Sequence, residues 1–371
     1  MLGLFYLELR RFTGRQTRLI RLEYVWGELS KIGPISILVG SAPKKRQSKL
    51  TTLLFILSII VGLPACALTP PAPTPTSITL QLSWTHSAQF AGFYAAEQNG
   101  DYAAEGLAVT FIEGGPQVDR QIALLDNMAQ FGLGSGVELI TARAEGKPLR
   151  AIATILRRDP FAFFSLAGSD ITRPEDFVGK TLLVRPRALP ILGAMMARAG
   201  IAPDQYHING DADFTALYSG EVDVATGFVT AQRIEAEHAG YKVNVIYPDD
   251  YGVHLNSDNI FAADDFIAAN PDLVRRFLRA TLKGWTYVVE NPDAAGALVA
   301  KYNPQANAAL EIENMAASLP LINTGEDHLG WIKPEVWAGM EQTLRAQGVL
   351  TQPLQVTEVY TLQFLQEIYQ Q

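Results

Sequence analysis

The spacing of apolar residues changes several times along the chain, and each change marks a predicted element. Apolar and polar side chains alternate at residues 78–83, which is typical of a β-strand buried on one face. A polar and aromatic bend at residues 84–90 leads into a helix rich in small residues, which ends at Asn99 and Gly100. A second strand follows at residues 107–112. This order predicts a β-α-β unit whose first loop lies at the carboxyl end of a strand, where open α/β sheets bind ligands.

The loop after the first strand carries side chains that suit a flat, partly polar ligand. Trp84, Gln89 and Phe90 lie within seven residues of one another. Aromatic rings can stack on such a ligand, and an amide can hydrogen-bond its edge. Packing of both rings against the end of the sheet would explain the same residues equally well.

A glycine-rich bend gives a second candidate contact region in the first lobe. Residues 131–136 predict a strand that runs into this bend, and a helix begins at Val137. Backbone N–H groups near Ser135 and Gly136 would then lie at a helix N-terminus, which favours polar or anionic groups. Glu138 either accepts N–H donors of a heterocycle or is a first-turn acid favoured by the helix dipole. Another strand is predicted at residues 149–156.

A second series of strands and helices follows Gly168, where we place the first crossover between two lobes. The strand at residues 181–184 ends at Arg185 and Arg187, whose planar forks suit carboxylate or phosphate groups. A solvated rim is the alternative for these two arginines. Helices are predicted at residues 191–199 and 214–219, with a short strand at residues 208–209 between them.

The end of this second series supplies the remaining candidate contacts. A strand at residues 222–228 presents Phe228 and Thr230 at its mouth, and a strand at residues 243–247 leads to a return crossover near Tyr251. Strands that alternate with helices in two successive series predict two open α/β lobes with a ligand cleft between them.

The chain beyond Asn270 is predicted to be helical. Asn270 is expected to cap a helix that Pro271 begins, and Trp285 recurs at helical spacing, as a core residue does. Further helices are predicted at residues 294–302, 308–319, 334–347 and 356–369.

Charge and histidine placement exclude several classes of function. Residues 1–50 hold ten of the 30 basic and three of the 38 acidic residues, which leaves a net charge of −15 from Cys66 onward. A surface of this sign disfavours nucleic acid. The five histidines are scattered without metal-ligand spacing, and no GxSxG motif occurs. We therefore expect that the protein has no metal site and no cofactor, that it does not bind nucleic acid, and that it is not an enzyme.

The segment around the single cysteine, Cys66, predicts export. A basic stretch at residues 44–49 precedes an apolar run at residues 50–63, and the following Leu-Pro-Ala-Cys resembles a bacterial lipobox. We predict a lipoprotein signal peptide at residues 44–65, with Cys66 as the lipidation site; a single-pass anchor is the alternative. Either one would hold the protein at the outer side of the cell membrane, in the periplasm or at the cell surface.

Two further segments flank this signal. Residues 66–77 contain four prolines and are expected to form a tether without a core. Residues 1–43 show no pattern of turns and caps that predicts a fold. They are either an over-called start of translation or a cytoplasmic extension.

The opening motif resembles a known family. Its matching positions are Leu82, Trp84, Gly92, Tyr94, Ala95, Gly100, Tyr102, Glu105, Gly106 and Leu107. They are similar to the opening of the thiamine-pyrimidine-precursor-binding, or thiamine biosynthesis-like, family of ABC-importer solute-binding proteins, and the likeness extends over about residues 78–345. The resemblance implies the two-lobed type II periplasmic binding protein fold with two hinge crossovers. Lobe 1 would comprise residues 78–168 and 256–371, and lobe 2 residues 169–255.

This resemblance implies a monomeric receptor that closes on a small flat vitamin or vitamin precursor and delivers it to an ABC permease and its ATPase. The expected ligand contacts are Trp84, Gln89, Phe90, Tyr94, Ser135, Gly136, Glu138, Arg185, Phe228, Thr230 and Tyr251. The family pattern has an acid before the tryptophan, a later His-x-Gly and a second acid, where this chain has Ser83, Phe90 and Val137. Compared with the family pattern, this chain has fewer charged groups and more aromatic area at these positions. Riboflavin is therefore an alternative ligand to a thiamine pyrimidine precursor.

Three other functions are weaker alternatives. A sulfonate or nitrate receptor would need more convergent cations than Arg185 and Arg187 provide. A pyrimidine-synthesising enzyme, as in one eukaryotic branch that resembles this family, would carry a cysteine-rich motif, which a chain with one cysteine lacks. A sensor ectodomain would need a transmembrane helix and an output module, and the sequence predicts neither before Gln371.

Overall fold

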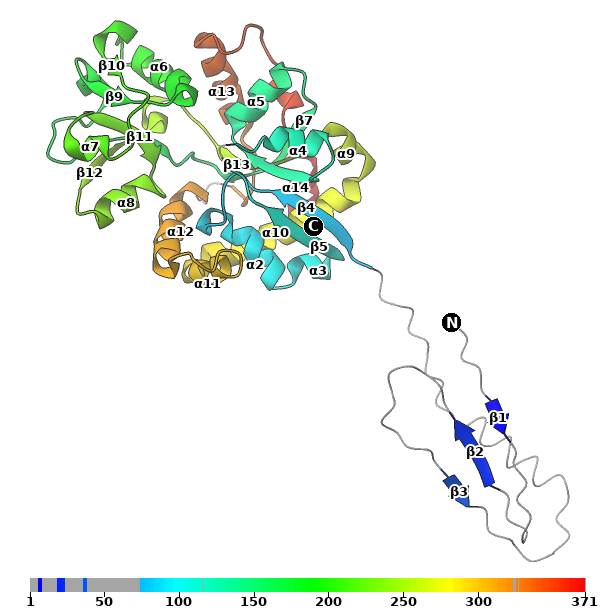
Figure 1. Ribbon diagram of the computed structural model, residues 1–371. Helices are drawn as coiled ribbons and strands as arrows, with labels where there is room; N and C mark the ends of the chain where they lie inside the picture. Colours follow the sequence, from blue (N-terminus) through cyan, green and yellow to red (C-terminus); the bar gives the residue numbers. More distant parts are fainter. Residues whose placement is uncertain are drawn as a thin grey trace, which may run out of the picture. The chain divides into compact units, whose positions relative to one another are not determined.

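The computed structural model describes residues 74–115, 117–322, 325 and 327–370, and three short strands nearer the N-terminus (Figure 1). The chain divides into two units, Met1–Ala72 and Pro73–Gln371. In the first unit, β1 (Tyr6–Glu8), β2 (Leu19–Glu23) and β3 (Ser36–Leu38) form an antiparallel sheet. No fold was predicted there. The predicted signal peptide and Cys66 lie outside the described residues.

The first sheet of the second unit has the strand order β5-β4-β6-β13-β7. Its strands are β4 (Thr76–Gln81), β5 (Leu107–Ile112), β6 (Phe131–Gly134), β7 (Leu149–Leu156) and β13 (Ser257–Ala263). The parallel β4–β5 pair runs from Thr76 opposite Leu107 to Gln81 opposite Ile112, which confirms the predicted β-α-β unit. Thr76 and Ser77 were assigned to the tether, but they pair in this sheet, so the tether ends earlier.

The second sheet has the strand order β10-β9-β11-β8-β12. Its strands are β8 (Phe161–Leu166), β9 (Thr181–Leu183), β10 (His207–Ile208), β11 (Val224–Phe228) and β12 (Val243–Ile246). Strand β8 pairs antiparallel with both β11 and β12, so the first crossover lies before Phe161. The predicted boundary after Gly168 is therefore wrong. An apolar strand buried on both faces does not reveal in its sequence which sheet it joins.

The two segments that connect the sheets lie side by side. The chain crosses between Leu156 and Phe161 and returns between Ile246 and Ser257. The backbone N–H of Asp159 donates to the Leu255 carbonyl oxygen at 3.1 Å. Arg158 pairs with Asp250 at 2.6 Å, and its guanidinium carbon lies 4.0 Å from the ring centroid of Tyr247. Both crossovers are thus held together by main-chain and side-chain contacts.

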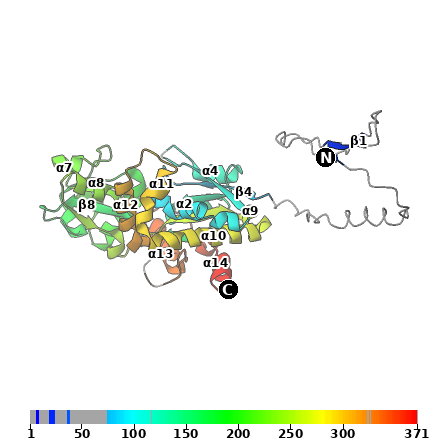
Figure 2. The same ribbon diagram turned by 90° about the horizontal axis from the view of Figure 1, so that it is seen from below.

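The lobe 1 helices pack around the first sheet. Helix α10 (Pro271–Glu290) lies against α2 (Ala91–Gln98), as Figure 2 shows, and also against α3 (Asp101–Ala104). Trp285 is fully buried on α10, as predicted. Asn270 does not cap this helix through its side chain, because its Nδ2 donates instead to the Phe266 carbonyl oxygen at 3.1 Å.

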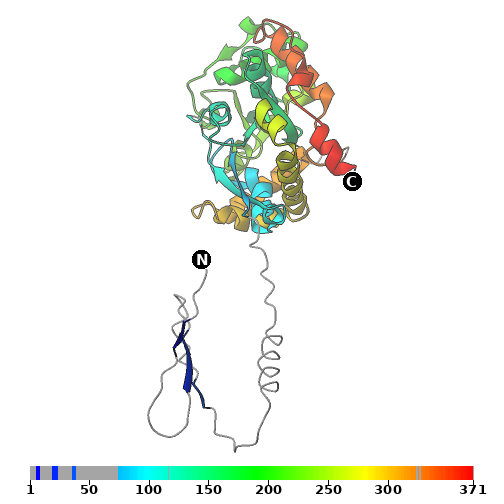
Figure 3. The same cartoon turned by 90° about the vertical axis from the view of Figure 1, so that its right-hand side faces the viewer.

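The remaining helices complete the two lobes. In the first lobe they are α4 (Arg120–Leu125), α5 (Gly136–Ala144), α9 (Asp264–Ala269), α11 (Ala295–Ala300), α12 (Ala308–Ile322), α13 (Pro334–Ala346) and α14 (Gln363–Tyr369). In the second lobe they are α6 (Leu189–Arg198), α7 (Ala216–Ser219) and α8 (Gln232–His238). Helix α13 contacts both α5 and α6 and so touches both lobes. The last helix was predicted at residues 356–369, but it begins only at Gln363; it lies next to the C-terminus (Figure 3).

The described part of the chain contains no helix that meets the length and hydropathy needed to cross a membrane.

Candidate functional site

A polar cluster lies at the carboxyl end of β4, where ligand contacts were predicted. It consists of Ser83, Gln89, Arg120, Glu138 and Asp258. These residues come from the loop after β4, from η1 (Ala88–Phe90), from the first turns of α4 and α5, and from β13. The fold therefore brings five polar side chains, from different segments of the chain, to the carboxyl end of β4 in the first sheet.

Asp258 is the centre of one half of this cluster. Gln89 Nε2 lies 2.9 Å and 3.0 Å from the two carboxylate oxygens of Asp258. The Ser83 hydroxyl donates to Asp258 Oδ1 at 3.2 Å and accepts from Gln89 Nε2 at the same distance. Both N–H groups of the Gln89 amide can therefore be satisfied within the cluster.

The environment of Asp258 is unusual for an acid. The residue is only 3% exposed, and its backbone has a φ of 47°, in the left-handed region. Burial raises the pKa of the carboxyl group to about 7, against the lowering effect of the hydrogen bonds from Gln89 and Ser83. Asp159 raises this pKa further, and Arg120 lowers it. Sequence reasoning missed Asp258, because it stands in the polar run Asn256-Ser257-Asp258-Asn259 and no local pattern marks it as buried.

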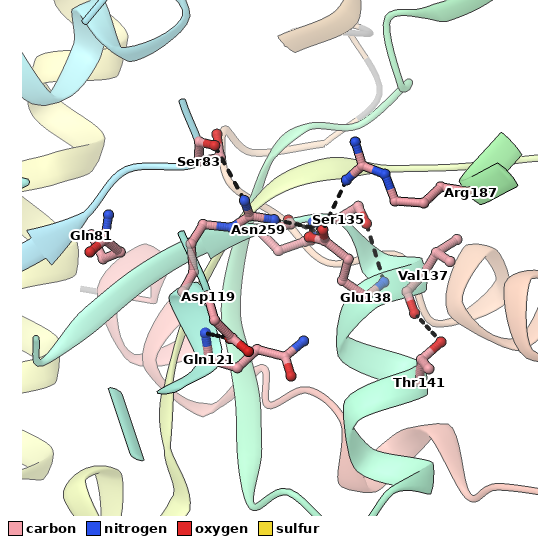
Figure 4. A network of polar contacts seen from close by, with 12 residues as sticks. Gln81, Ser83, Asp119, Gln121, Ser135, Val137, Glu138, Thr141, Arg187 and Asn259 are labelled. Carbon is pink, nitrogen blue, oxygen red and sulfur yellow. Dashed lines mark hydrogen bonds and ion pairs between the residues drawn. The ribbon is translucent and has the colours of Figure 1, made fainter. Parts of the chain in front are cut away.

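Arg120 and Glu138 form the other half of the cluster, and Figure 4 shows Glu138 together with Arg187 of the second lobe. Arg120 Nη1 donates to the Ser83 carbonyl oxygen at 3.3 Å, and Nη2 pairs with Glu138 Oε1 at 2.6 Å. Arg187, from the second lobe, lies 3.9 Å from the same Glu138 oxygen. Glu138 thus joins two cations, one from each lobe, at the mouth of the first sheet.

Ser135 and Gly136 have structural roles that compete with the predicted ligand contacts. Ser135 Oγ accepts from the Glu138 N–H at 3.2 Å, and Glu138 Oε2 accepts from the Ser135 N–H at 3.0 Å. This reciprocal pair is a capping box that begins α5. The Gly136 N–H donates to the Asn256 carbonyl oxygen at 3.2 Å, so it is not free for a ligand.

The aromatic residues of the opening motif separate into exposed and buried rings. Trp84 is 46% exposed, whereas Phe90 and Tyr94 are fully buried in the lobe 1 core. The Tyr94 ring stacks on Tyr302 with centroids 4.3 Å apart, and its hydroxyl lies 2.6 Å from His86 Nδ1. Neither ring reaches solvent in this conformation, so both pack in the lobe 1 core, and the ligand contacts expected of Phe90 and Tyr94 stay predictions.

The predicted contacts from the second lobe do not all gather at the mouth. Arg185 donates to the carbonyl oxygens of Gly210 and Ala212 at 2.5 Å and 2.9 Å, so its fork is occupied by the main chain. Tyr251 packs against the lobe 2 core, and burial raises the pKa of its hydroxyl. Its nearby acids are Glu175 and Asp176 from η2 (Pro174–Phe177), together with Asp250.

Phe228 and Thr230 lie beside the first crossover. Phe228 is 47% exposed, and its ring makes an edge contact with Phe161 at a centroid distance of 6.3 Å. The Val229 N–H donates to the Pro160 carbonyl oxygen at 2.9 Å, which fixes the backbone next to half-buried Thr230. Trp84 and Phe228 are therefore the two exposed aromatic rings among the predicted contacts, one from each lobe.

Comparison with known proteins places the chain in a family. Residues 87–295, more than half of the chain, match the family described as NMT1/THI5 like. The chain belongs to the NMT1/THI5-like family. Among solved structures, it is similar to the aliphatic sulphonate binding protein SsuA from Escherichia coli (TM-score 0.60, 15% identity, covering 77% of this chain and 92% of that one). At this identity the likeness shows the fold alone, and it confirms the predicted two-lobed periplasmic binding protein fold.

Curated relatives cover most of the chain. The riboflavin-binding protein RibY of Chloroflexus aurantiacus is 28% identical over 345 residues, which cover 85% of this chain and 98% of the relative. The formylaminopyrimidine-binding protein of Halalkalibacterium halodurans is 26% identical and covers 77% of this chain and 89% of the relative. A 4-amino-5-hydroxymethyl-2-methylpyrimidine phosphate synthase of Legionella pneumophila is 25% identical over 78% of this chain and 92% of the relative.

The names of these NMT1/THI5-like relatives fall into two functional classes, binding proteins and a synthase. The described residues of this chain contain no group of three or more His, Cys, Asp or Glu side chains that could hold a metal ion. The acids and cations of the polar cluster are paired with one another or with amides and hydroxyls. Such an arrangement suits hydrogen bonding to a ligand edge.

Proposed function

We propose that this chain is the extracytoplasmic solute receptor of an ABC importer, which captures a small flat heteroaromatic vitamin or vitamin precursor. The observation that carries the proposal is that exposed Trp84 directly follows Ser83, a member of the polar cluster at the carboxyl end of β4. A flat ligand could stack on the indole while its edge hydrogen-bonds the cluster. Phe228 offers a second exposed ring from the other lobe.

The two lobes supply a physical basis for capture and delivery. The pair Glu138–Arg187, at 3.9 Å, is a polar contact between the lobes at the mouth. The paired crossovers are short, and a hinge motion there would bring the lobes together around a ligand. Closure would change the surface that a permease meets, so delivery would depend on the loaded state.

A thiamine pyrimidine precursor is the first candidate ligand. It is supported by the resemblance of the opening motif and by the similarity to the formylaminopyrimidine-binding protein. Riboflavin is the second candidate, supported by the similarity to the riboflavin-binding protein over 98% of its length and by the two exposed aromatic rings. A sulfonate is less well supported, because Arg120 and Arg187 both lie against Glu138 and leave no purely cationic surface.

We further propose that the receptor is anchored by a lipid on Cys66, acts as a monomer, and performs no chemistry on its ligand. The anchor rests on the basic, apolar and lipobox segments of residues 44–66. The absence of catalysis is tested by recovering the ligand after release and checking that its mass is unchanged.

Titration of the purified full chain with each candidate, followed by tryptophan fluorescence, tests the proposal. Quenching by an aminopyrimidine alone supports the thiamine precursor, and quenching by riboflavin alone supports the flavin. Replacing Trp84 by Phe should remove most of the quenching, whereas the matched Trp331→Phe change should not. If neither compound alters the spectrum at millimolar concentration, the heteroaromatic class is wrong.

A further inference from the structure

The side-chain amide nitrogen of Gln89 is hydrogen-bonded within the polar cluster, whereas its amide oxygen is not. Its Nε2 atom has Asp258 and Ser83 as acceptors at 2.9–3.2 Å. No described residue donates a hydrogen bond to Gln89 Oε1, and this atom is not among the buried side-chain atoms without a partner. The Gln89 oxygen therefore keeps contact with solvent at the mouth of the first lobe.

The orientation of this amide follows from the charge of Asp258. An ionised carboxylate only accepts hydrogen bonds, so it attracts the amide nitrogen and repels the amide oxygen. Rotating the amide by half a turn would place its oxygen about 3 Å from two carboxylate oxygens, and Ser83 alone could not compensate for that repulsion. An Asn at position 258 would present both a donor and an acceptor and would accept either orientation.

We propose that Asp258 is a positioning residue that fixes the Gln89 amide with its oxygen toward the ligand, so that the site selects a ligand edge carrying an N–H donor. This inference rests on the proposed function and narrows its ligand class. An exocyclic amino group of a pyrimidine and the ring imide N–H of a flavin are both edges of this kind. A ligand that presents only acceptors to Gln89 is disfavoured, because a site arranged for one hydrogen-bond pattern leaves a group unpaired with the opposite one.

Protonation of Asp258 relaxes this selection. A protonated carboxyl group can donate to the Gln89 oxygen, which makes the reversed amide orientation accessible. The raised pKa of Asp258, about 7, places the change near neutral pH. The charged groups that act on Asp258 are Asp159, which favours its protonation, and Arg120, which opposes it. Selectivity for the donor edge is therefore expected to be strongest above pH 7 and to fall as the pH is lowered.

The first test needs no ligand. The full chain is labelled with ¹⁵N-glutamine, and the side-chain NH₂ signal of Gln89 is assigned by its loss in Gln89→Met. This signal should shift with a midpoint near pH 7 in the native protein and should not titrate in Asp258→Asn. The matched Asp293→Asn variant removes an exposed acid of the same lobe and should leave the titration unchanged. A Gln89 signal whose shift at pH 8.5 is the same in the native protein and in Asp258→Asn overturns the positioning role.

The second test uses matched ligands. Riboflavin has an N–H donor at N3, and its N3-methyl derivative lacks it. In the same way, an aminopyrimidine has an amino donor that the ring without the amino group lacks. At pH 8 the donor form of whichever pair binds should be favoured about tenfold, the value of one hydrogen bond. The ratio should fall severalfold in Asp258→Asn and at pH 5.5 in the native protein. An equal ratio in Asp258→Asn overturns the inference. If no member of either pair binds while the Gln89 signal titrates, the proposed ligand class has failed and the positioning role has not.

Discussion

Gly92 lies directly against the indole ring of Trp285, and no side chain fits between them. A Cβ atom built on Gly92 would lie 2.1 Å from Trp285 Cδ2, and one built on Gly284 would lie 2.2 Å from the Gly92 carbonyl oxygen. Both residues belong to the crossing of α2 and α10. This close packing fixes the position of α2, the helix that follows the loop carrying Trp84. It therefore also constrains where that loop lies.

Replacing Gly92 by Ala should destabilise the protein by about 3 kcal/mol, because the rigid indole has to move to admit a methyl group. The measurement is the free energy of unfolding from urea titration. The matched control is Gly339→Ala in α13, where a Cβ meets nothing within 4 Å. Alanine should there stabilise the helix by up to about 1 kcal/mol. Equal effects at the two positions would contradict the close-packing argument.

Ser135→Ala should cost about 1 kcal/mol of stability, because the first turn of α5 loses the acceptor of its Glu138 N–H group. Ligand affinity should change little, since Ser135 acts here on the helix. Calorimetric unfolding and a ligand titration of the same variant check both parts. A large loss of affinity with unchanged stability would restore Ser135 as a ligand contact.

Much of the fold could be predicted because the local patterns agree with the final packing. The β-α-β unit, the strand at Leu149–Leu156 and the helix beginning at Pro271 follow directly from periodicity and from glycine and proline positions. Strand β13 was missed, since its mixture of polar and apolar residues has no regular period. The polar residues of β13 are explained only by their partners, such as Thr154 and Gly134 for Asn259.

The site was harder to predict, because its roles depend on partners far apart in sequence. Nothing local distinguishes Trp84, which is exposed, from Phe90, which is buried six residues later. Glu138 was predicted to be either a first-turn helix acid or a ligand contact. The capping box confirms the helix role, but its pairing with Arg120 is a tertiary contact that no local pattern predicts. Asp258 becomes an acid of interest only after β13 is placed beside β6 and its carboxylate meets Gln89.

The two aromatic residues of the opening loop should behave in opposite ways when truncated. Phe90→Ala should cost about 3–5 kcal/mol of stability, because it leaves a cavity in a fully buried position. Trp84→Ala should cost little stability and should weaken ligand binding about tenfold or more through lost stacking. Urea unfolding and ligand titration of both variants separate the two roles. A loss of affinity in folded Phe90→Ala equal to that in Trp84→Ala would mean that Phe90 reaches the ligand after all.

Asp258 should make the stability of the protein fall as the pH rises toward neutral. Its pKa is about 7 in the folded chain and about 3.9 in an unfolded one, so the folded state binds more protons between these values. The favourable contribution is complete below about pH 4 and is lost as the pH rises through 7.

Replacement by Asn removes this titration while keeping the shape of the side chain, and Asn tolerates the left-handed backbone at this position. Between pH 5 and pH 8 the native protein should therefore lose up to about 3 kcal/mol of stability relative to Asp258→Asn. Asp159, whose pKa is also raised by burial, contributes a slope of the same sign in both proteins, so the difference between the two curves reports Asp258 together with its interaction with Asp159. Urea unfolding at several pH values measures both curves, and parallel curves would show that Asp258 is already ionised at pH 5.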